Sequence, residues 1–342
     1  MNMSEPIHFT DSPLRGELRS GVAMSRQTSW RAGGVAERMY QPADLADLQT
    51  FLRGVSPDEP LYVVGLGSNL LVRDGGLRGT VILLHGALKE LRVDGVNALY
   101  VEAGVPGAKL ARFAALHDLA GAAFFAGIPG TLGGMLAMNA GCYGSETWQH
   151  VSRVQVLLRN GDLVERGASE YEIGYRHVLR IEDRGSRIEK AGLRSAERGA
   201  GGALGLPQSS ILNPQSSEEF FVSATLRFES GDGEIERQAI KDLLSKRIAS
   251  QPLNLPNAGS VFRNPVGDHA ARLIESCGLK GKRIGGAQVS EKHANFIVNA
   301  GGATAADIEN LINEVRAIVL AKTGIDLHPE VKIIGEYASN HG

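Results

Sequence analysis

The spacing of hydrophobic residues changes along the chain between a helical period and an alternating one, so both helices and strands are predicted. The clearest helix spans 304–323, where Thr304 is suited to the N-cap and Gly324 to the C-terminal stop. Another helix is expected to open at Pro42, because proline costs no hydrogen bond in the first turn. Further helices are expected at 108–119, 236–248 and 270–277.

Short apolar or alternating runs predict strands between these helices. The runs are 37–41, 61–64, 70–72, 80–84, 91–93, 99–101, 220–228, 295–299 and 331–334. Two hairpins are expected, one turning at Asp94-Gly95 and one, within 151–164, turning at Asn160-Gly161. Strands and helices mix without strict alternation, which predicts an α+β fold rather than a single doubly wound parallel sheet.

Changes in composition suggest how the 342 residues are divided. Residues 1–27 show no periodicity and are expected to form a mobile arm. The pattern fails again over about 181–217, a stretch rich in charge, glycine and serine that we expect to be a mobile insertion. The glycine-rich turn at 231–233 marks a boundary, so the predicted domains are 28–230 and 231–342.

Composition narrows the class of protein. Hydrophobic residues make up 43% of the chain and the net charge is −2, which is ordinary for a globular protein and offers no basic surface for nucleic acid or an anionic membrane. No apolar run reaches the ~18–20 residues of a membrane helix. Two distant cysteines, Cys142 and Cys277, have no neighbours at metal-ligand spacing. We therefore expect a cytoplasmic protein with reduced thiols and no metal.

A glycine-rich loop, Gly65-Leu66-Gly67-Ser68-Asn69, follows the apolar run 61–64. Backbone N–H groups in such a turn can hold a phosphate, and glycine lets the ligand approach without a Cβ clash. A glycine-rich loop of this kind, without other evidence, is more often a structural turn than a phosphate-binding site. It is not a dinucleotide-binding fingerprint, because the third glycine is missing and the chain returns to a strand.

A second glycine-rich loop is more specific. Residues 127–134 read GIPGTLGG, and Asn139-Ala140-Gly141 adds another turn of small residues. Four glycines in eight residues expose backbone to something that packs closely, either a ligand or a neighbouring helix or strand. Two such loops suit a large ligand that carries a diphosphate and a flat ring.

These two loops resemble the flavin-contacting segments of the UDP-N-acetylenolpyruvoylglucosamine reductases. Four more segments match that family in order: 175–177, 257–265, 284–294 and 328–331, which read YRH, NAGSVFRNP, IGGAQVSEKHA and HPEV. The resemblance extends from about Thr28 to Glu336, and six ordered motifs are far more specific than any one of them. The stretch 181–217 matches neither subtype of the family, which leaves open what covers the substrate.

The resemblance implies the fold and the cofactors. Residues 28–230 would be an FAD-binding domain of the vanillyl-alcohol oxidase/p-cresol methylhydroxylase type, with two subdomains divided near 90–105, and 231–342 an α+β substrate domain. In this family NADPH reduces FAD, and hydride then passes to UDP-N-acetylglucosamine enolpyruvate to give UDP-N-acetylmuramate. The implied cofactor-binding residues are Gly65, Leu66, Gly67, Ser68, Asn69, Gly127, Ile128, Pro129, Gly130, Thr131, Gly133, Gly134, Asn139, Ala140 and Gly141.

Three residues match the family's catalytic positions. Ser260 would donate a proton to the carbanion that hydride addition leaves; without its motif it would be taken for a turn residue. Arg176 would hold the substrate carboxylate as its charge grows, although a surface ion pair is the plainer interpretation. Glu330 would act when protonated, or by orienting the Ser260 hydroxyl or a water, and burial would raise its pKa.

Candidates for substrate binding are Tyr175, Lys246, Arg263 and Asn264, with Arg247 considered beside Lys246. Basic side chains on a helix are more often solvated, so Lys246 and Arg247 have the weaker case. The sequence does not identify which basic residues bind the substrate diphosphate. We expect a monomer, although no pattern in the sequence determines the oligomeric state.

Two other functions remain open at this stage. One is a flavin oxidase of the same superfamily, in which Cys142 would be the nearest candidate for a covalent flavin link. The other is a flavin- or nucleotide-sugar-binding protein without turnover. The joint presence of Arg176, Ser260 and Glu330 argues against the second.

Overall fold

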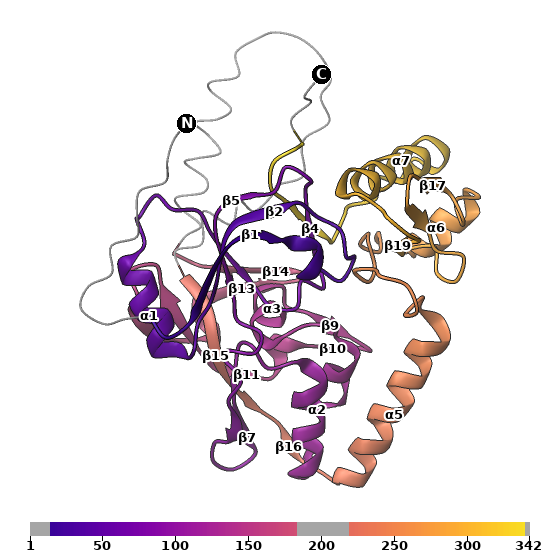
Figure 1. Cartoon of the computed structure of the whole chain (residues 1–342). Helices are drawn as coiled ribbons and strands as arrows, with labels where there is room; N and C mark the ends of the chain where they lie inside the picture. The colour runs from indigo at the N-terminus through magenta and orange to yellow at the C-terminus, as the bar shows by residue number, and fades with distance from the viewer. Residues whose placement is uncertain (1–13, 183–218, 339–342) are drawn as a thin grey trace.

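The computed structural model describes residues 14–182 and 219–338 (Figure 1). The first layer is a four-stranded sheet of order β1-β2-β5-β3, in which β1 is antiparallel and the other three strands are parallel. Its strands and its helix are β1 Glu17–Ala23, β2 Val35–Gln41, β3 Leu61–Val64, β5 Leu77–Leu83 and α1 Leu45–Gly54. The apolar face of α1 packs on this sheet through Leu48, Phe51 and Leu52.

The second layer is a five-stranded antiparallel sheet of order β12-β11-β15-β7-β6. Its strands are β6 Leu91–Val93, β7 Ala98–Glu102, β11 Val151–Leu158, β12 Leu163–Gly167 and β15 Glu219–Arg227. Both predicted hairpins are found here, since β6 pairs with β7 and β11 with β12. Helix α2 Gly107–Leu116 shares the core of this layer with the short helix α3 Leu132–Ala137.

The third part of the fold contains the C-terminal helices (Figure 1). Helix α7 Ala305–Thr323 packs with α6 Ala270–Ser276 and with a small sheet of β17 Arg283–Ile284, β18 Ala287–Val289 and β19 Ile297–Asn299. Thr304 caps α7 and Gly324 ends it with φ 73°, as the sequence predicted. Strand β20 Lys332–Ile334 leaves this part of the fold and pairs in parallel with β4 Leu70–Val72.

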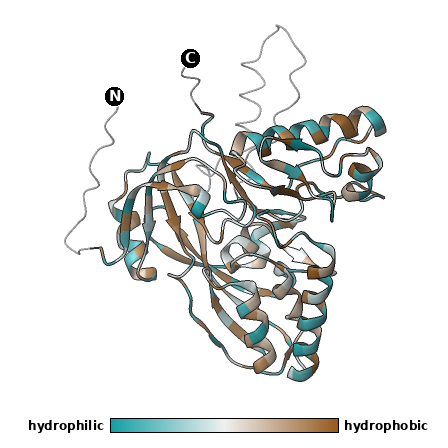
Figure 2. Ribbon diagram, turned by 45° about the vertical axis from the view of Figure 1, so that its right-hand side comes forward, coloured by the Kyte–Doolittle hydropathy of each residue, from teal (hydrophilic) through white to brown (hydrophobic). Residues whose placement is uncertain are grey.

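Short elements connect these layers. Several are two-stranded pairs: β8 Leu119–Ala120 with β16 Glu229–Ser230, β9 Gly141–Cys142 with β10 Ser145–Glu146, and β13 Tyr171–Gly174 with β14 His177–Arg180. The long helix α5 Gly233–Ser250 leads toward the C-terminal part. Figure 2 shows that hydrophobic residues concentrate in the sheet strands, while the outer faces of the helices are hydrophilic.

Two expectations about the N-terminal part differ from the structure. Residues 17–23 of the expected mobile arm form β1, because β2 supplies hydrogen-bonding partners along the whole strand. Helix α1 begins at Leu45 rather than at Pro42, because the Asp44 side chain accepts a hydrogen bond from the Asp47 N–H and caps it. Residues Met24–Arg26 of the arm form a short 3-10 helix, whereas residues 1–13 and 183–218, which hold the first half of the arm and nearly all of the expected insertion, lie outside the described residues.

The packing of the hydrophobic cores also disagrees with the domain boundary that composition predicted at residue 231. Helix α5 lies beyond that boundary, yet its buried Ile240 belongs to the core formed by α2 and the five-stranded sheet. Conversely, Trp30 belongs to the C-terminal core, where its indole N–H donates to the Ile297 carbonyl at 2.7 Å. The cores therefore exchange segments across the boundary that composition suggested.

Candidate active site

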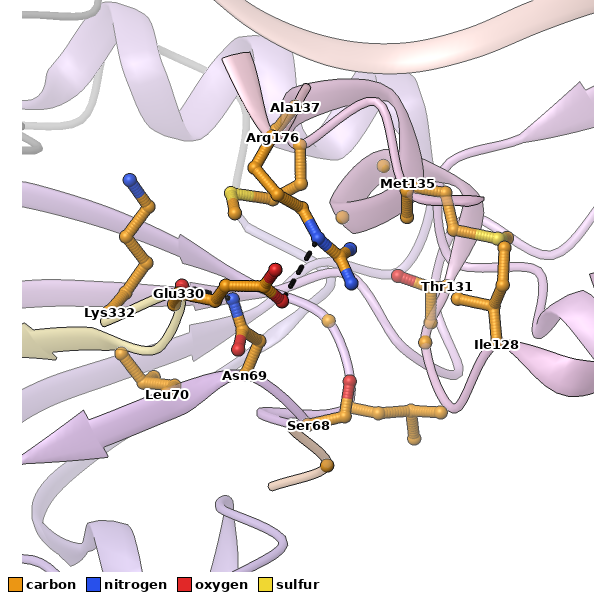
Figure 3. Close-up of a pocket in the computed structure, with 18 of the residues that line it drawn as sticks. Ser68, Asn69, Leu70, Ile128, Thr131, Met135, Ala137, Arg176, Glu330 and Lys332 are labelled. Atoms are coloured by element: carbon orange, nitrogen blue, oxygen red, sulfur yellow. Dashed lines mark hydrogen bonds and ion pairs between the residues drawn. The ribbon is translucent and has the colours of Figure 1, made fainter. Parts of the chain in front are cut away.

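A cavity of about 650 Å³ lies where the three parts of the fold meet (Figure 3). Its volume is within the usual range for small-molecule sites. It is lined by the segments that the sequence singled out: the loop after β3, residues between Gly127 and Cys142, the tip of the β13–β14 hairpin, residues around Ser260, and Glu330 with the following β20 residues Lys332 and Ile334. Segments more than 260 positions apart in the sequence thus line the same cavity.

The two glycine-rich loops face each other across this cavity. A Cβ on Gly65 would lie 2.3 Å from the Thr131 hydroxyl, and a Cβ on Gly130 would lie 3.6 Å from the Ser68 hydroxyl. Gly67 has φ 59°, and a side chain there would strike the Gln27 carbonyl at 1.9 Å. Glycine at 65 therefore allows the close approach of the two loops, and glycine at 67 allows the approach of the chain at Gln27. The lining includes every predicted cofactor-binding residue except Asn139: Gly65–Asn69, Gly127–Thr131, Gly133, Gly134, Ala140 and Gly141.

Asn139 lies behind the cavity wall rather than on it, unlike the expectation. Its side-chain amide donates to Glu146 at 2.8 Å and to the Gly174 carbonyl at 3.3 Å, and its side-chain oxygen accepts from the Trp148 N–H. A residue at φ 38° is uncommon outside glycine, and asparagine tolerates it better than most. Asn139 therefore shapes the wall and fixes the start of the Tyr175-Arg176 hairpin.

The tip of the β13–β14 hairpin brings two predicted site residues into the cavity. Gly174 pairs with His177, so Tyr175 and Arg176 form a two-residue turn, with Arg176 at φ 54°. The Tyr175 hydroxyl donates to one oxygen of Glu330, and the Arg176 Nε lies 3.4 Å from the other. Burial, reinforced by the bond to Glu330, raises the pKa of Tyr175 to about 12.

Ser260 and Glu330 are adjacent because two distant segments pair. Phe262 bridges to Pro329, and the Glu330 N–H donates to the Val261 carbonyl at 2.7 Å. Gly259, at φ 78°, turns the chain just before Ser260, and its N–H donates to the Asn257 side chain at 3.0 Å. Both Ser260 and Glu330 line the cavity. The structure therefore brings all three predicted catalytic residues together.

Asn295 holds this arrangement, and sequence reasoning gave it no role. Its buried side chain accepts from the Phe262 N–H at 2.9 Å and donates to the Phe262 carbonyl at 2.8 Å. Its backbone carbonyl accepts from the Val261 N–H at 2.9 Å. One residue thus fixes both residues that follow Ser260. The sequence showed only a residue at the start of a strand.

The end of the first glycine-rich loop is tied to the same region. The Asn69 side chain donates to the Glu330 carbonyl at 3.1 Å, and the Asn69 carbonyl accepts from the Lys332 N–H at 3.0 Å. The amide that was expected to contact a ligand is therefore engaged by the protein. This link fixes the glycine loop relative to Glu330.

The basic residues of the cavity differ from those expected. Lys246 is exposed and outside the lining, whereas its neighbour Arg247 lines the cavity and donates to Gln251 at 3.0 Å. Lys332, which sequence reasoning did not single out, also lines it. Burial lowers the pKa of both side chains, and for Lys332 the positive charge of Arg263 adds to the effect.

The other two candidates for substrate binding have different surroundings. Asn264 lines the cavity, and its side-chain oxygen accepts from the Ala270 N–H at the start of α6 at 3.0 Å. Arg263 does not line it; its guanidinium lies 5.8 Å from the centre of the Tyr175 ring. Arg263 therefore supports a site residue instead of facing the cavity itself.

The described residues contain neither a metal-binding cluster nor a membrane-spanning helix. Within 14–182 and 219–338, no three His, Cys, Asp or Glu side chains gather closely enough to hold a metal ion. No helix in these same ranges is both long and apolar enough to cross a membrane.

Comparison with known proteins gives consistent matches. Residues 36–167 match the model of an FAD binding domain, and 251–334 match the C-terminal domain of UDP-N-acetylenolpyruvoylglucosamine reductase. The reductase of Nitrosospira multiformis is 55% identical over 98% of this chain and 94% of its own length. That of Thiobacillus denitrificans is 52% identical over 98% of both chains. The crystal structure of the Thermus caldophilus reductase, 27% identical, superposes with a TM-score of 0.71 over 93% of this chain and 98% of that one.

Proposed function

Because the chain belongs to the UDP-N-acetylenolpyruvoylglucosamine reductase family, we propose that it reduces UDP-N-acetylglucosamine enolpyruvate to UDP-N-acetylmuramate. The electrons come from NADPH through FAD, and the reaction is a step of peptidoglycan precursor synthesis in the cytoplasm by a monomeric enzyme. The observation that carries the proposal is the meeting of Arg176, Ser260 and Glu330 in a cavity walled by two glycine-rich loops. Neither the oxidase nor the non-catalytic alternative accounts for these three residues together.

The walls of the cavity fit an FAD molecule. The loops at Gly65–Asn69 and Gly127–Thr131 present backbone close to the cavity, and Gly134 has open space where a Cβ would be. Backbone N–H groups in such loops suit the diphosphate. When bound, FAD supplies the hydride chemistry, accepting hydride from NADPH and delivering it to the substrate. The residues of the chain then have to orient the substrate, stabilise the negative charge that hydride addition leaves, and supply a proton.

Ser260 is assigned as the proton donor. Hydride addition to the terminal carbon of an enolpyruvyl group leaves negative charge on the carbon next to the carboxylate. A positioned hydroxyl can supply the missing proton, and as a neutral group it does not disturb the charge balance before reaction. Asn295 and the turn at Gly259 hold the backbone on either side of Ser260, which limits the directions its hydroxyl can take.

Arg176 is assigned to the substrate carboxylate. In Figure 3 its guanidinium points into the cavity between Glu330 and Thr131. A guanidinium can bind a carboxylate through two parallel hydrogen bonds, and these strengthen as charge accumulates on the oxygens. The positive φ of Arg176, 54°, is of the kind that tight two-residue hairpin turns require, and this turn places its side chain at the cavity.

Glu330 is assigned to orient the donor. Its side chain is only 4% exposed, and its backbone N–H donates to the Val261 carbonyl, next to Ser260. A carboxylate here would repel the negative charge of the reacting group, so a direct role in stabilising that charge is unfavourable. Holding the Ser260 hydroxyl, or a water beside it, uses the same position without that cost.

The test is an anaerobic assay of NADPH oxidation with and without UDP-N-acetylglucosamine enolpyruvate. We expect oxidation of about one equivalent per bound flavin without substrate and continued oxidation when substrate is present. Reduction of the flavin that stops despite added substrate would leave the FAD assignment and overturn the substrate. Oxygen consumption with an alcohol or a phenol, and no need for NADPH, would instead favour an oxidase.

A further inference from the structure

The contacts of Tyr175 within the protein suggest a role other than direct binding of substrate. Its hydroxyl group is already engaged as a donor to Glu330. The guanidinium carbons of Arg176 and Arg263 lie 5.9 and 5.8 Å from the centre of its ring, within the range of cation–π attraction. The ring of Tyr175 is therefore held by two cations while its hydroxyl group is held by one acid.

Glu330 depends on these contacts. A carboxylate that is 4% exposed needs partners, because an unpaired buried charge is costly. Among the described residues, its two carboxylate oxygens have one partner each, the Tyr175 hydroxyl and the Arg176 guanidinium. If Arg176 turns to the carboxylate of a substrate, as its assigned role requires, the Tyr175 hydroxyl is the contact that remains.

We propose that Tyr175 is a positioning residue, whose hydroxyl keeps Glu330 fixed beside Ser260 while Arg176 binds the substrate carboxylate. This inference rests on the proposed reductase function, and it replaces the earlier expectation that Tyr175 binds substrate. The group suits the task, because burial and the bond to Glu330 raise the pKa of Tyr175 to about 12. Tyr175 therefore keeps its proton, and remains a hydrogen-bond donor, at neutral pH.

The test is Tyr175→Phe in the FAD-loaded full-length protein, which removes the hydroxyl and keeps the ring. We expect kcat for product formation to fall roughly ten- to a hundredfold, since small errors in placing catalytic groups cost about this much. The KM for the nucleotide sugar and the rate of flavin reduction by NADPH should stay within about twofold. A raised KM with unchanged kcat would show uniform substrate binding and overturn the proposal. No change in either constant would overturn it as well.

A double-mutant cycle separates positioning from general damage. If Tyr175 acts through Glu330, then Tyr175→Phe should change kcat by less than about twofold in a Glu330→Gln background. Additive losses would overturn the proposal. Tyr143→Phe is the matched control, because Tyr143 is a half-exposed tyrosine outside the cavity lining, and its hydroxyl donates to the Leu243 carbonyl at 3.4 Å. A wild-type protein that fails to turn over the nucleotide sugar would instead refute the reductase function itself.

Discussion

Ser260 lies between the turn at Gly259 and two residues that Asn295 holds by hydrogen bonds, so removing its hydroxyl should change chemistry and not shape. For Ser260→Ala we expect flavin reduction by NADPH at the wild-type rate and product formation slowed by about 10²–10⁴, the usual contribution of a positioned proton donor. Anaerobic stopped-flow measurement of the two half-reactions checks this. Ser276→Ala is the control, since the Ser276 hydroxyl donates to a carbonyl in α6, outside the cavity lining. Normal product turnover in Ser260→Ala would rule out the donor role.

Cys142 offers a second single-residue prediction. Its Sγ donates to the Phe124 carbonyl at 3.2 Å, and burial raises the pKa of the thiol to about 11. Only the thiolate reacts with iodoacetamide, and a thiolate is tenfold rarer for each unit by which the pKa exceeds the pH. At pH 8 we expect alkylation roughly a hundredfold slower in the native protein than in the unfolded one, rising as the pH approaches 11.

Peptide mapping by mass spectrometry would measure alkylation of Cys142 separately from that of Cys277. Equal rates in native and unfolded protein would contradict the raised pKa. A thiol that stays protonated also disfavours Cys142 as the point of a covalent flavin link. Flavin that remains attached after denaturation would reopen that possibility.

At the residue scale, the sequence predicted the motifs better than the directions of side chains. Arg176, Ser260 and Glu330 do meet in one cavity. Lys246 and Arg247 are neighbours on a helix, so their side chains point about 100° apart and only Arg247 faces the cavity. Helix α5 buries only Gly233 and Ile240, so its apolar pattern was too weak to show which of the two faces inward.

At the scale of elements, prediction succeeded where signals were local. Both ends of α7 were predicted because a cap and a left-handed glycine act within one turn. Strand β1 was missed because it is an edge strand with no fully buried residue, so no alternation marks it. Its stability comes from pairing with β2, which local sequence does not reveal.

The N-terminus of α7 provides the element-scale prediction. The Thr304 hydroxyl accepts from the Asp307 N–H at 3.0 Å, and the Asp307 side chain accepts from the Thr304 N–H at 3.0 Å. Thr304→Ala removes half of this capping box and should lower the free energy of unfolding by about 1 kcal/mol. Thr304→Ser keeps the hydroxyl and should lose much less. Denaturant titration of both variants checks this, and equal losses would show that the methyl group matters instead.

At the scale of the whole molecule, the features hardest to predict are contacts between distant segments. Strand β20 pairs with β4 across about 260 residues, and this pairing puts Glu330 beside the first glycine-rich loop. Just beyond β4, Asp74 accepts hydrogen bonds from the N–H groups of Ala305 and Ala306 at the start of α7. Besides the apolar packing of Trp30 and Leu71 in the C-terminal core, these specific polar contacts set the relative placement of the substrate-side and flavin-side walls.

The strongest of these contacts is an ion pair between Arg73 and Glu309 of α7. Their side chains are 13% and 11% exposed, and the guanidinium donates to both carboxylate oxygens at 2.9 Å and to the Gly335 carbonyl at 3.1 Å. Arg73→Met leaves Glu309 buried without its main partner, so we expect a loss of roughly 3–5 kcal/mol in the free energy of unfolding. Replacing both residues by apolar ones should recover much of that loss.

Another ion pair in the same part of the fold provides the control. Arg78 and Glu336 are 2.8 Å apart, but their side chains are 79% and 52% exposed. Arg78→Met should therefore cost no more than about 1 kcal/mol. Denaturant titration of the FAD-loaded variants compares the two sites under identical conditions. If Arg73→Met costs no more than Arg78→Met, the buried pair does not hold α7 to β4, and the alignment of the two walls must depend on the other contacts across this junction: the β4–β20 pairing, the Asp74 hydrogen bonds and the packing of Trp30 and Leu71 in the C-terminal core.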